Sequence, residues 1–226
     1  MNGILLVDKP SGWTSFDVVN YVRKIVATRE GKKPKHVKVG HTGTLDPLAT
    51  GLLVLLLGDY TKRAPELTKL DKTYEVTMKL GETSTTGDEE GEKSKVSTRE
   101  VTEPELVAGL KKFEGEIMQT PPAYSAVKVN GQRAYKLARA GKAFEIEPRK
   151  VTIHKIELKK YEYPFVDFTA EVSSGTYIRA LVEDIGKELG TGAYMSDLRR
   201  TRVGQFDLKG ARQIKDKSLL QHTFVV

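Results

Sequence analysis

The stretch Gly40-His41-Thr42-Gly43-Thr44-Leu45-Asp46-Pro47-Leu48-Ala49-Thr50-Gly51 runs directly into the apolar segment Leu52–Leu57. The apolar segment is typical of a buried strand. We therefore expect the stretch before it to be a loop held on a rigid scaffold, where functional residues often collect. Pro47 disfavours a helical conformation at Asp46. An ordinary turn, in which His41 bonds to its neighbours, is the alternative that the residue types alone leave open.

The 226-residue chain has the composition of a globular protein, with 38% hydrophobic residues. Its longest apolar run, Leu52–Leu57, has six residues, far fewer than a membrane-spanning helix needs. The first residues, Met1–Asp8, lack the basic region and the long apolar region of a signal peptide. We therefore expect a cytoplasmic protein that makes no contact with a membrane.

The chain contains no cysteine and four histidines, His36, His41, His154 and His222. No two of these histidines have the spacing of a metal-binding motif such as His-x-x-x-His. The sequence therefore predicts neither a metal site nor a cofactor. Any covalent chemistry is left to Asp, Glu, Ser, Thr, Lys or Tyr side chains.

The chain is basic, with 37 Lys and Arg residues against 30 Asp and Glu residues and a net charge of +7. Five basic residues lie between Arg29 and Lys38, and a second cluster contains Arg199, Arg200 and Arg202. The acidic segment Asp88–Glu92 is expected to be a turn that faces away from any phosphate. This distribution favours a polyanionic partner, although a solvated surface is an equal alternative.

The periodicity of apolar residues predicts strands and helices mixed with hairpins. A buried strand is expected at Gly3–Val7, and a helix capped by Thr14 or Ser15 at Ser15–Ala27. Tyr74–Leu80 alternates between apolar and polar residues, as a half-buried strand does. The later elements are a capped helix at Thr102–Glu114, an Asn-Gly hairpin at Ala126–Gly131, a short helix at Ala134–Ala140, strands at Val151–Leu158 and Val166–Val172, and a helix at Tyr177–Leu189. This order predicts the α+β class with a mixed, mostly antiparallel sheet flanked by helices.

Five segments, in the same order, resemble the TruB family of tRNA pseudouridine synthases. Besides the Gly40–Gly51 loop they are Gly3–Pro10, Asp71–Tyr74, Ser174–Arg179 and Leu198–Gly204. The resemblance covers residues 3 to 210. It implies a pseudouridine synthase core in residues 1–212, with a thumb-like insertion at 121–147 and a C-terminal tail at 213–226. Family members commonly carry a further C-terminal RNA-binding domain, and the chain is expected to lack a full one.

The resemblance implies an isomerase that converts the T-loop uridine of tRNA, at position 55, to pseudouridine after flipping it out of the RNA. Asp46 is then the catalytic carboxylate, and either attack on the ribose or removal of its C2′ proton is open. Arg179 would pair with Asp46 and favour the charged carboxylate. Tyr74 would stack on the uracil and act on the C5 proton, although its alternating strand also suits simple core packing.

The same resemblance implies further contacts with substrate. Tyr177 and Leu198 match positions that line the uridine pocket. His41 matches the residue that fills the space of the flipped nucleotide. Lys9 is expected to support the active site. The cations expected to contact RNA are Lys9, Lys62, Lys128, Arg133, Lys136 and Arg200.

The expected partner is the T-arm stem-loop of tRNA, bound by a monomer. Two other functions compete with this one. An RNA methyltransferase would need a glycine-rich cofactor loop, and Gly40–Gly51 does not have the Gly-x-Gly-x-x-Gly spacing. A non-catalytic tRNA-binding or tRNA-folding module would fit the composition and charge equally well.

Overall fold

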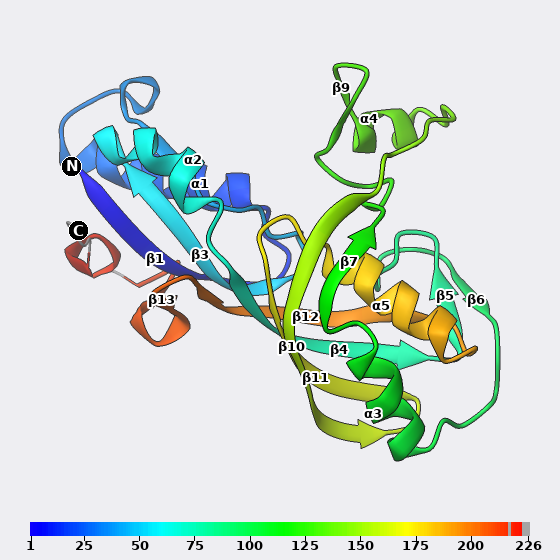
Figure 1. The fold of residues 1–226 in the computed structure, drawn as a ribbon. Helices are drawn as coiled ribbons and strands as arrows, with labels where there is room; N and C mark the ends of the chain where they lie inside the picture. The colour runs from blue at the N-terminus through cyan, green and yellow to red at the C-terminus, as the bar shows by residue number, and fades with distance from the viewer. Residues whose placement is uncertain (217, 223–226) are drawn as a thin grey trace. The chain divides into compact units, whose positions relative to one another are not determined.

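The computed structural model describes residues 1–216 and 218–222 (Figure 1). The chain divides into two compact units, one of Met1–Tyr74 with Leu198–Val226 and the other of Glu75–Asp197. The predicted tail at 213–226 belongs to the first unit, and part of it, residues 217 and 223–226, lies outside the described residues.

The first unit is built on strands β1 (Gly3–Lys9) and β3 (Thr50–Leu57), which pair antiparallel along their whole length. β2 (Val39–His41) also pairs antiparallel with β3, whereas β12 (Ala193–Val203) pairs parallel with it at Thr50 and Gly51. The short β14 (Arg212–Gln213) pairs parallel with β1. The strands predicted at Gly3–Val7 and Leu52–Leu57 are therefore confirmed.

The apolar run in β3 is continuous because both faces of the strand are buried. Leu53, Leu55 and Leu57 pack on one side with the valines of helix α1 (Ser15–Arg29). Their neighbours Leu52, Val54 and Leu56 pack on the other side in a second apolar cluster. A strand covered on both faces shows an unbroken hydrophobic run instead of alternation.

Helix α1 begins as predicted, because Thr14 and Asp17 form a reciprocal capping box. Its buried residues Val18, Val19, Val22 and Val26 recur at helical spacing and face the sheet. The remaining short elements of this unit are η1 (Pro34–His36), η2 (Gly58–Arg63), α2 (Ala64–Leu67), β13 (Phe206–Asp207), η3 (Leu208–Gly210) and η4 (Leu219–His222).

The second unit contains β4 (Lys72–Leu80) from Glu75 onward, β11 (Phe165–Val172), β10 (Arg149–Glu162) and β7 (Gly115–Gln119), adjacent in this order. β10 pairs antiparallel with both β11 and β7. Helices α3 (Glu103–Lys111) and α5 (Ile178–Glu188) contact each other. Most strand pairings within the two units are antiparallel, so the predicted fold class is confirmed.

The predicted insertion contains the expected hairpin and helix. Strands β8 (Lys128–Val129) and β9 (Gln132–Arg133) are joined by Asn130 and Gly131, which both have positive φ, as an Asn-Gly hairpin turn requires. Helix α4 (Ala134–Arg139) follows. In Figure 1, β9 and α4 project from the rest of their unit.

The sequence analysis missed β7 and the long β12, together with the short strands β2, β13 and β14. The polar segment from Gly81 to Arg99, expected to be loop with at most one short strand, forms the hairpin of β5 (Glu82–Ser84) and β6 (Lys93–Lys95). No helix in the described part of the chain combines the length and the apolar character that crossing a membrane requires.

Candidate active site

The Gly40–Gly51 loop connects β2 and β3, which pair with each other, so both of its ends are fixed by the sheet. Inside the loop the backbone N–H of Thr42 donates to the carbonyl of Val54 at 3.1 Å. Asp46 is half-buried in the middle of this loop. The loop is therefore anchored to the scaffold on both sides of its carboxylate.

Helix α1 holds the residue before Asp46. The Ser15 hydroxyl donates to the Leu45 carbonyl at 3.0 Å and accepts the Leu45 N–H at 2.8 Å. Both residues are buried, Ser15 at 2% exposure and Leu45 at 3%. Because buried polar groups are expensive to leave unpaired, this double contact fixes the backbone directly before the carboxylate.

Lys9, at the end of β1, holds the residue after Asp46. Its side chain is fully buried and donates to the carbonyls of Pro10, Trp13 and Pro47 at 2.9, 2.6 and 3.1 Å. The Gly12 N–H also donates to the Pro47 carbonyl, at 2.9 Å. The backbone is thus held on each side of Asp46 by a different element.

Arg200 is buried against the same loop, with only 1% of its surface exposed. Its Nε donates to the Leu52 carbonyl at 2.8 Å and its Nη2 to the Gly43 carbonyl at 3.0 Å. Two glycines of the loop allow this close approach. A Cβ at Gly43 would lie 3.4 Å from Arg200 Nη1, and one at Gly51, where φ is +96°, would lie 2.3 Å from the Arg200 carbonyl oxygen.

A third buried cation, Lys72, completes this cluster by donating to the carbonyls of Thr68 and Leu70. Burial, and then the charge of Arg200, lowers the pKa of both Lys9 and Lys72 to about 8. For Lys9 the carboxylate of Asp46 acts in the opposite direction and favours the charged amine.

These contacts correct the prediction that Lys9 and Arg200 face RNA, because neither side chain reaches the surface. The neighbouring Arg199 is also used internally, donating to Asp8 at 2.8 Å. The basic cluster predicted around Arg200 therefore serves the scaffold of the loop. The expectation that Lys9 supports the active site agrees with its contacts.

His41 is half-buried at the start of the loop, and its Nδ1 accepts the N–H of Gly43 at 3.3 Å. Burial, and then the nearby charge of Arg200, lowers the pKa of His41. An Nδ1 that accepts a hydrogen bond belongs to a neutral ring with its proton on Nε2. The loop therefore carries a neutral imidazole five residues before Asp46.

Leu198 and Tyr74 belong to the same unit as the loop. The Leu198 carbonyl accepts a hydrogen bond from the Thr50 hydroxyl at 3.5 Å, so Leu198 lies at the end of the loop. Tyr74 points to the buried face of β4 and is 8% exposed. The adjacent Thr73 carbonyl accepts from the Thr201 hydroxyl at 3.4 Å, which joins this part of β4 to β12.

Arg179 lies in the first turn of α5 in the second unit and is 6% exposed. It donates to the carbonyls of Thr86 and Tyr124 at 3.0 and 2.9 Å. Its Nη1 also lies 3.5 Å from Oδ2 of Asp88. Asp88 is 4% exposed, whereas Glu89, Glu90 and Glu92 of the predicted acidic turn are exposed.

The hydrogen bonds of Asp88 explain this burial. Its Oδ1 accepts from the Thr86 hydroxyl at 2.5 Å and from the Glu90 N–H at 3.1 Å. A buried carboxylate is tolerated when it is paired and hydrogen-bonded, and Asp88 meets both conditions. No local pattern indicates this ion pair, because Asp88 and Arg179 are about ninety residues apart in the chain.

Tyr177, the N-cap residue of α5, is held by a second residue that the sequence analysis missed. The buried side-chain amide of Gln119 accepts the Tyr177 N–H at 2.8 Å and donates to the Tyr177 carbonyl at 3.1 Å. Tyr177 and Arg179 are thus fixed within the second unit. Asp46 belongs to the first, so the pairing of Asp46 with Arg179 stays a prediction.

The other cations expected to contact RNA are exposed. Lys62 lies in η2 and pairs with Asp59 at 3.2 Å. Lys128, Arg133 and Lys136 lie on β8, β9 and α4 of the insertion. All four side chains are therefore accessible to a ligand from solvent.

Comparison with known proteins assigns most of the chain to one family. Residues 29–178 match the N-terminal domain of TruB family pseudouridylate synthases, and residues 179–223 match the tRNA pseudouridylate synthase B C-terminal domain. The tRNA pseudouridine synthase B of Pseudomonas fluorescens is 49% identical over 210 residues, which are 92% of this chain and 66% of that protein. The protein of the same name from Flavobacterium johnsoniae is 43% identical, with 93% of this chain and 92% of that protein covered.

Solved structures agree with this relationship. A Cbf5–Nop10–Gar1 complex contains a chain that is 33% identical, with a TM-score of 0.73 over 95% of this chain and 53% of that chain. An H/ACA ribonucleoprotein bound to a substrate RNA containing 2′-deoxyuridine gives 31% identity and a TM-score of 0.69. The chain thus spans somewhat less than two thirds of the Pseudomonas relative and about half of the matched Cbf5 chain.

Proposed function

The chain belongs to the TruB family of pseudouridylate synthases, and we propose that it isomerises the T-loop uridine at position 55 of tRNA to pseudouridine. In this reaction the bond between ribose C1′ and uracil N1 breaks, the base rotates, and a bond forms between C1′ and C5. The C5 proton leaves and N1 gains a proton, so no atoms are exchanged with a second substrate. The chemistry requires neither an oxidant nor an energy source.

The observation that carries this proposal is the fixed loop around Asp46. Its neighbours Leu45 and Pro47 are held by Ser15 and by Lys9, and the loop is closed from below by Arg200. A carboxylate held in one position is suited to attack C1′ or to remove the C2′ proton, because correct placement lowers the barrier of either step. Both routes remain open for Asp46.

Arg179 is the proposed partner of Asp46. Its guanidinium is oriented by two backbone carbonyls and by Asp88, so its rigid fork of N–H donors is held in a defined direction. A guanidinium beside Asp46 would keep the carboxylate charged and oriented. Tyr74 is proposed to stack on the uracil and to act on its C5 proton, while Tyr177 and Leu198 line the uridine pocket.

A T-loop uridine is stacked inside folded RNA and must be flipped out before it reacts, which costs a few kcal/mol. We propose that His41 occupies the vacated space. Its neutral ring, with the proton on Nε2, offers a flat surface for stacking and a donor for a hydrogen bond. The exposed cations Lys62, Lys128, Arg133 and Lys136 are proposed to contact RNA phosphates.

The proposed partner is therefore the T-arm of tRNA, recognised by shape and backbone charge. We propose that the protein acts as a cytoplasmic monomer. The net charge of +7 suits such a ligand, and binding should weaken as salt is added.

The direct test is the Asp46→Asn variant, which keeps the shape of the side chain and removes its charge. We expect pseudouridine formation to be abolished while tRNA affinity changes less than about threefold, because the loss is confined to the reacting group. Asp59→Asn, at an exposed position, serves as the matched control. The assay combines nuclease digestion and chromatography of an unmodified tRNA with filter binding.

Normal turnover by Asp46→Asn would remove Asp46 from the reaction. A wild-type protein that binds tRNA but forms no pseudouridine would instead support a non-catalytic tRNA-binding module.

A further inference from the structure

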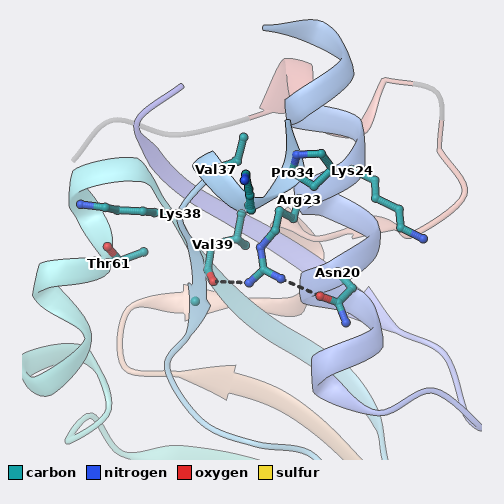
Figure 2. Close-up of a pocket in the computed structure, with 10 residues that line it drawn as sticks. Asn20, Arg23, Lys24, Pro34, Val37, Lys38, Val39 and Thr61 are labelled. Carbon is teal, nitrogen blue, oxygen red and sulfur yellow. Dashed lines mark hydrogen bonds between the residues drawn. The ribbon is translucent and has the colours of Figure 1, made fainter. Parts of the chain in front are cut away.

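A groove with a volume of about 600 Å³ opens on the first unit, between α1, the segment before β2, and η2. Four of its ten lining residues are basic, namely Arg23, Lys24, Lys35 and Lys38. Figure 2 shows Arg23 in the middle of this site, with Lys24 on one side and Lys38 on the other. The remaining lining residues include no carboxylate.

The four cations of the groove lack acidic partners. Within residues 1–216 and 218–222, none of them lies within ion-pair distance of a carboxylate. Nearby cations behave differently, since Lys32 pairs with Glu30 at 2.8 Å and Lys62 with Asp59 at 3.2 Å. Four like charges around one hollow repel each other, and a concave surface concentrates their field. Such a groove attracts an anion.

Arg23 is fixed in the groove instead of extending freely into solvent. Its Nη1 donates to Asn20 Oδ1 at 2.6 Å and its Nη2 to the Val39 carbonyl at 3.4 Å, as the dashed lines in Figure 2 show. A guanidinium has five N–H donors in a rigid fork. The two bonds orient this fork and leave other donors for a phosphate oxygen.

The groove also lies beside the loop that carries Asp46. Val39 and Gly40 line it, and the next residue along β2 is His41. Successive strand residues are only about 3.3 Å apart. A polyanion whose nucleotide reaches His41 would therefore have neighbouring phosphates within reach of the groove.

We propose that this groove binds the phosphodiester backbone of the RNA substrate next to the flipped nucleotide, an inference that rests on the proposed function. The exposed lysines favour an extended polyanion over a small anion, because a small anion needs several donors converging on one point. Lys24 and Lys35 come from separate segments, so together they can follow a strand of phosphates. The groove thereby extends the RNA contact beyond the thumb-like insertion.

The test replaces three exposed lysines of the groove together, as Lys24→Gln, Lys35→Gln and Lys38→Gln. Arg23 is kept because its side chain is half-buried and bonded to the scaffold. The control variant removes the same charge from β10, as Lys155→Gln, Lys159→Gln and Lys160→Gln, where the lysines pair with Glu157 and Glu162. Denaturant unfolding of both variants shows that each is folded.

The dissociation constant for unmodified full-length tRNA is measured by filter binding between 50 and 200 mM salt, with turnover at saturating tRNA measured in parallel. Each lost phosphate contact makes the slope of log affinity against log salt shallower by about 0.9. Three lost contacts therefore change the ratio of wild-type to variant affinity by up to about 40-fold between the two salt concentrations. We expect the groove variant to lose affinity mainly at low salt and to keep the wild-type turnover. The β10 variant should stay within about threefold of wild type in both measurements.

Equal affinities of the groove and β10 variants for tRNA would overturn the inference. So would groove-dependent binding to phosphatidylglycerol vesicles without any effect on tRNA. A wild-type protein that forms no pseudouridine, combined with a groove variant that binds tRNA weakly, would refute the proposed function and support the groove. An active wild-type protein, combined with a groove variant that binds tRNA as tightly as wild type, would support the proposed function and refute the groove.

Discussion

Ser15→Ala tests whether the loop scaffold positions the catalytic carboxylate. The substitution removes one hydroxyl that serves both the N–H and the carbonyl of Leu45, at 2.8 and 3.0 Å. Both backbone groups stay buried after the change, since Leu45 is 3% exposed. Asp46 follows directly and makes no use of the hydroxyl itself. Any effect on turnover must therefore pass through the position of the loop.

The expected magnitude follows from those two contacts. Leaving a buried donor or acceptor without a partner costs about 1–3 kcal/mol, so with two such groups the variant should lose about 2–6 kcal/mol of unfolding free energy unless the loop moves. If the loop moves to find new partners, the carboxylate moves with it. A displacement of about 1 Å at a reacting group can reduce turnover about 100-fold.

Thr14→Ala is the matched control, because Thr14 caps the same helix and its side-chain hydrogen bonds join it to Asp17. Loss of an N-cap costs about 1 kcal/mol. Single-turnover rates on unmodified tRNA, tRNA affinity and urea unfolding are measured for both variants. We expect both to be less stable and only Ser15→Ala to turn over slowly, with unchanged affinity. Turnover by Ser15→Ala within twofold of Thr14→Ala would refute the positioning role.

Two further predictions concern buried charges. The pKa of Lys9 is about 8 in the folded chain against an ordinary value of 10.5, so between these pH values unfolding takes up a proton and stability rises with pH. The difference in unfolding free energy between wild type and Lys9→Met should therefore increase by about 2 kcal/mol in favour of wild type between pH 7 and 9.5. Urea unfolding at several pH values measures this difference, and a difference that does not change with pH would contradict the prediction. Asp88→Asn should lower the single-turnover rate about 10- to 100-fold, because Arg179 loses a charged partner that helps to orient it. The exposed Glu90→Gln is its control, and equal rates for the two variants would exclude a positioning role for Asp88.

The elements predicted most reliably from the sequence are those determined by local chemistry. Helix α1 has its cap at Thr14 and a valine stripe within one segment, and the Asn130-Gly131 turn needs positive φ at both positions. Strand β3 is apolar throughout because both of its faces are covered. Each of these signals is complete within a short window of sequence.

Strand β12 could not be found in this way. Its segment Ala193–Val203 contains three arginines and an aspartate, and its polar residues do not alternate as on a solvent-facing strand. Arg200 is compatible with a buried strand only because the Leu52 and Gly43 carbonyls, about 150 residues earlier, accept its donors. Local propensity cannot report a partner supplied by a distant segment.

The same limit applied to charge at the candidate site. A basic cluster beside a family motif suggested contact with RNA, yet Arg200 is buried and Arg199 pairs with Asp8. The segment Asp88–Glu92 was expected to be an acidic turn, yet its first residue, Asp88, is buried against Arg179. In both cases the side chain is charged, as its residue type requires. Whether it is buried or exposed depends on the partner that a distant segment supplies. The site motif itself was readable from sequence because its residues are contiguous.

Three buried cations under one loop are unfavourable for stability taken alone. Replacing buried charged groups with well-packed apolar residues is often neutral or stabilising. Apolar side chains at Lys9 and Arg200, however, would leave the carbonyls of Pro47, Gly43 and Leu52 without these donors. The loop would then be free to choose other backbone conformations. The buried cations are therefore best understood as a means of selecting one loop conformation, with the depressed pKa of Lys9 as the measurable sign of the stability given up for it.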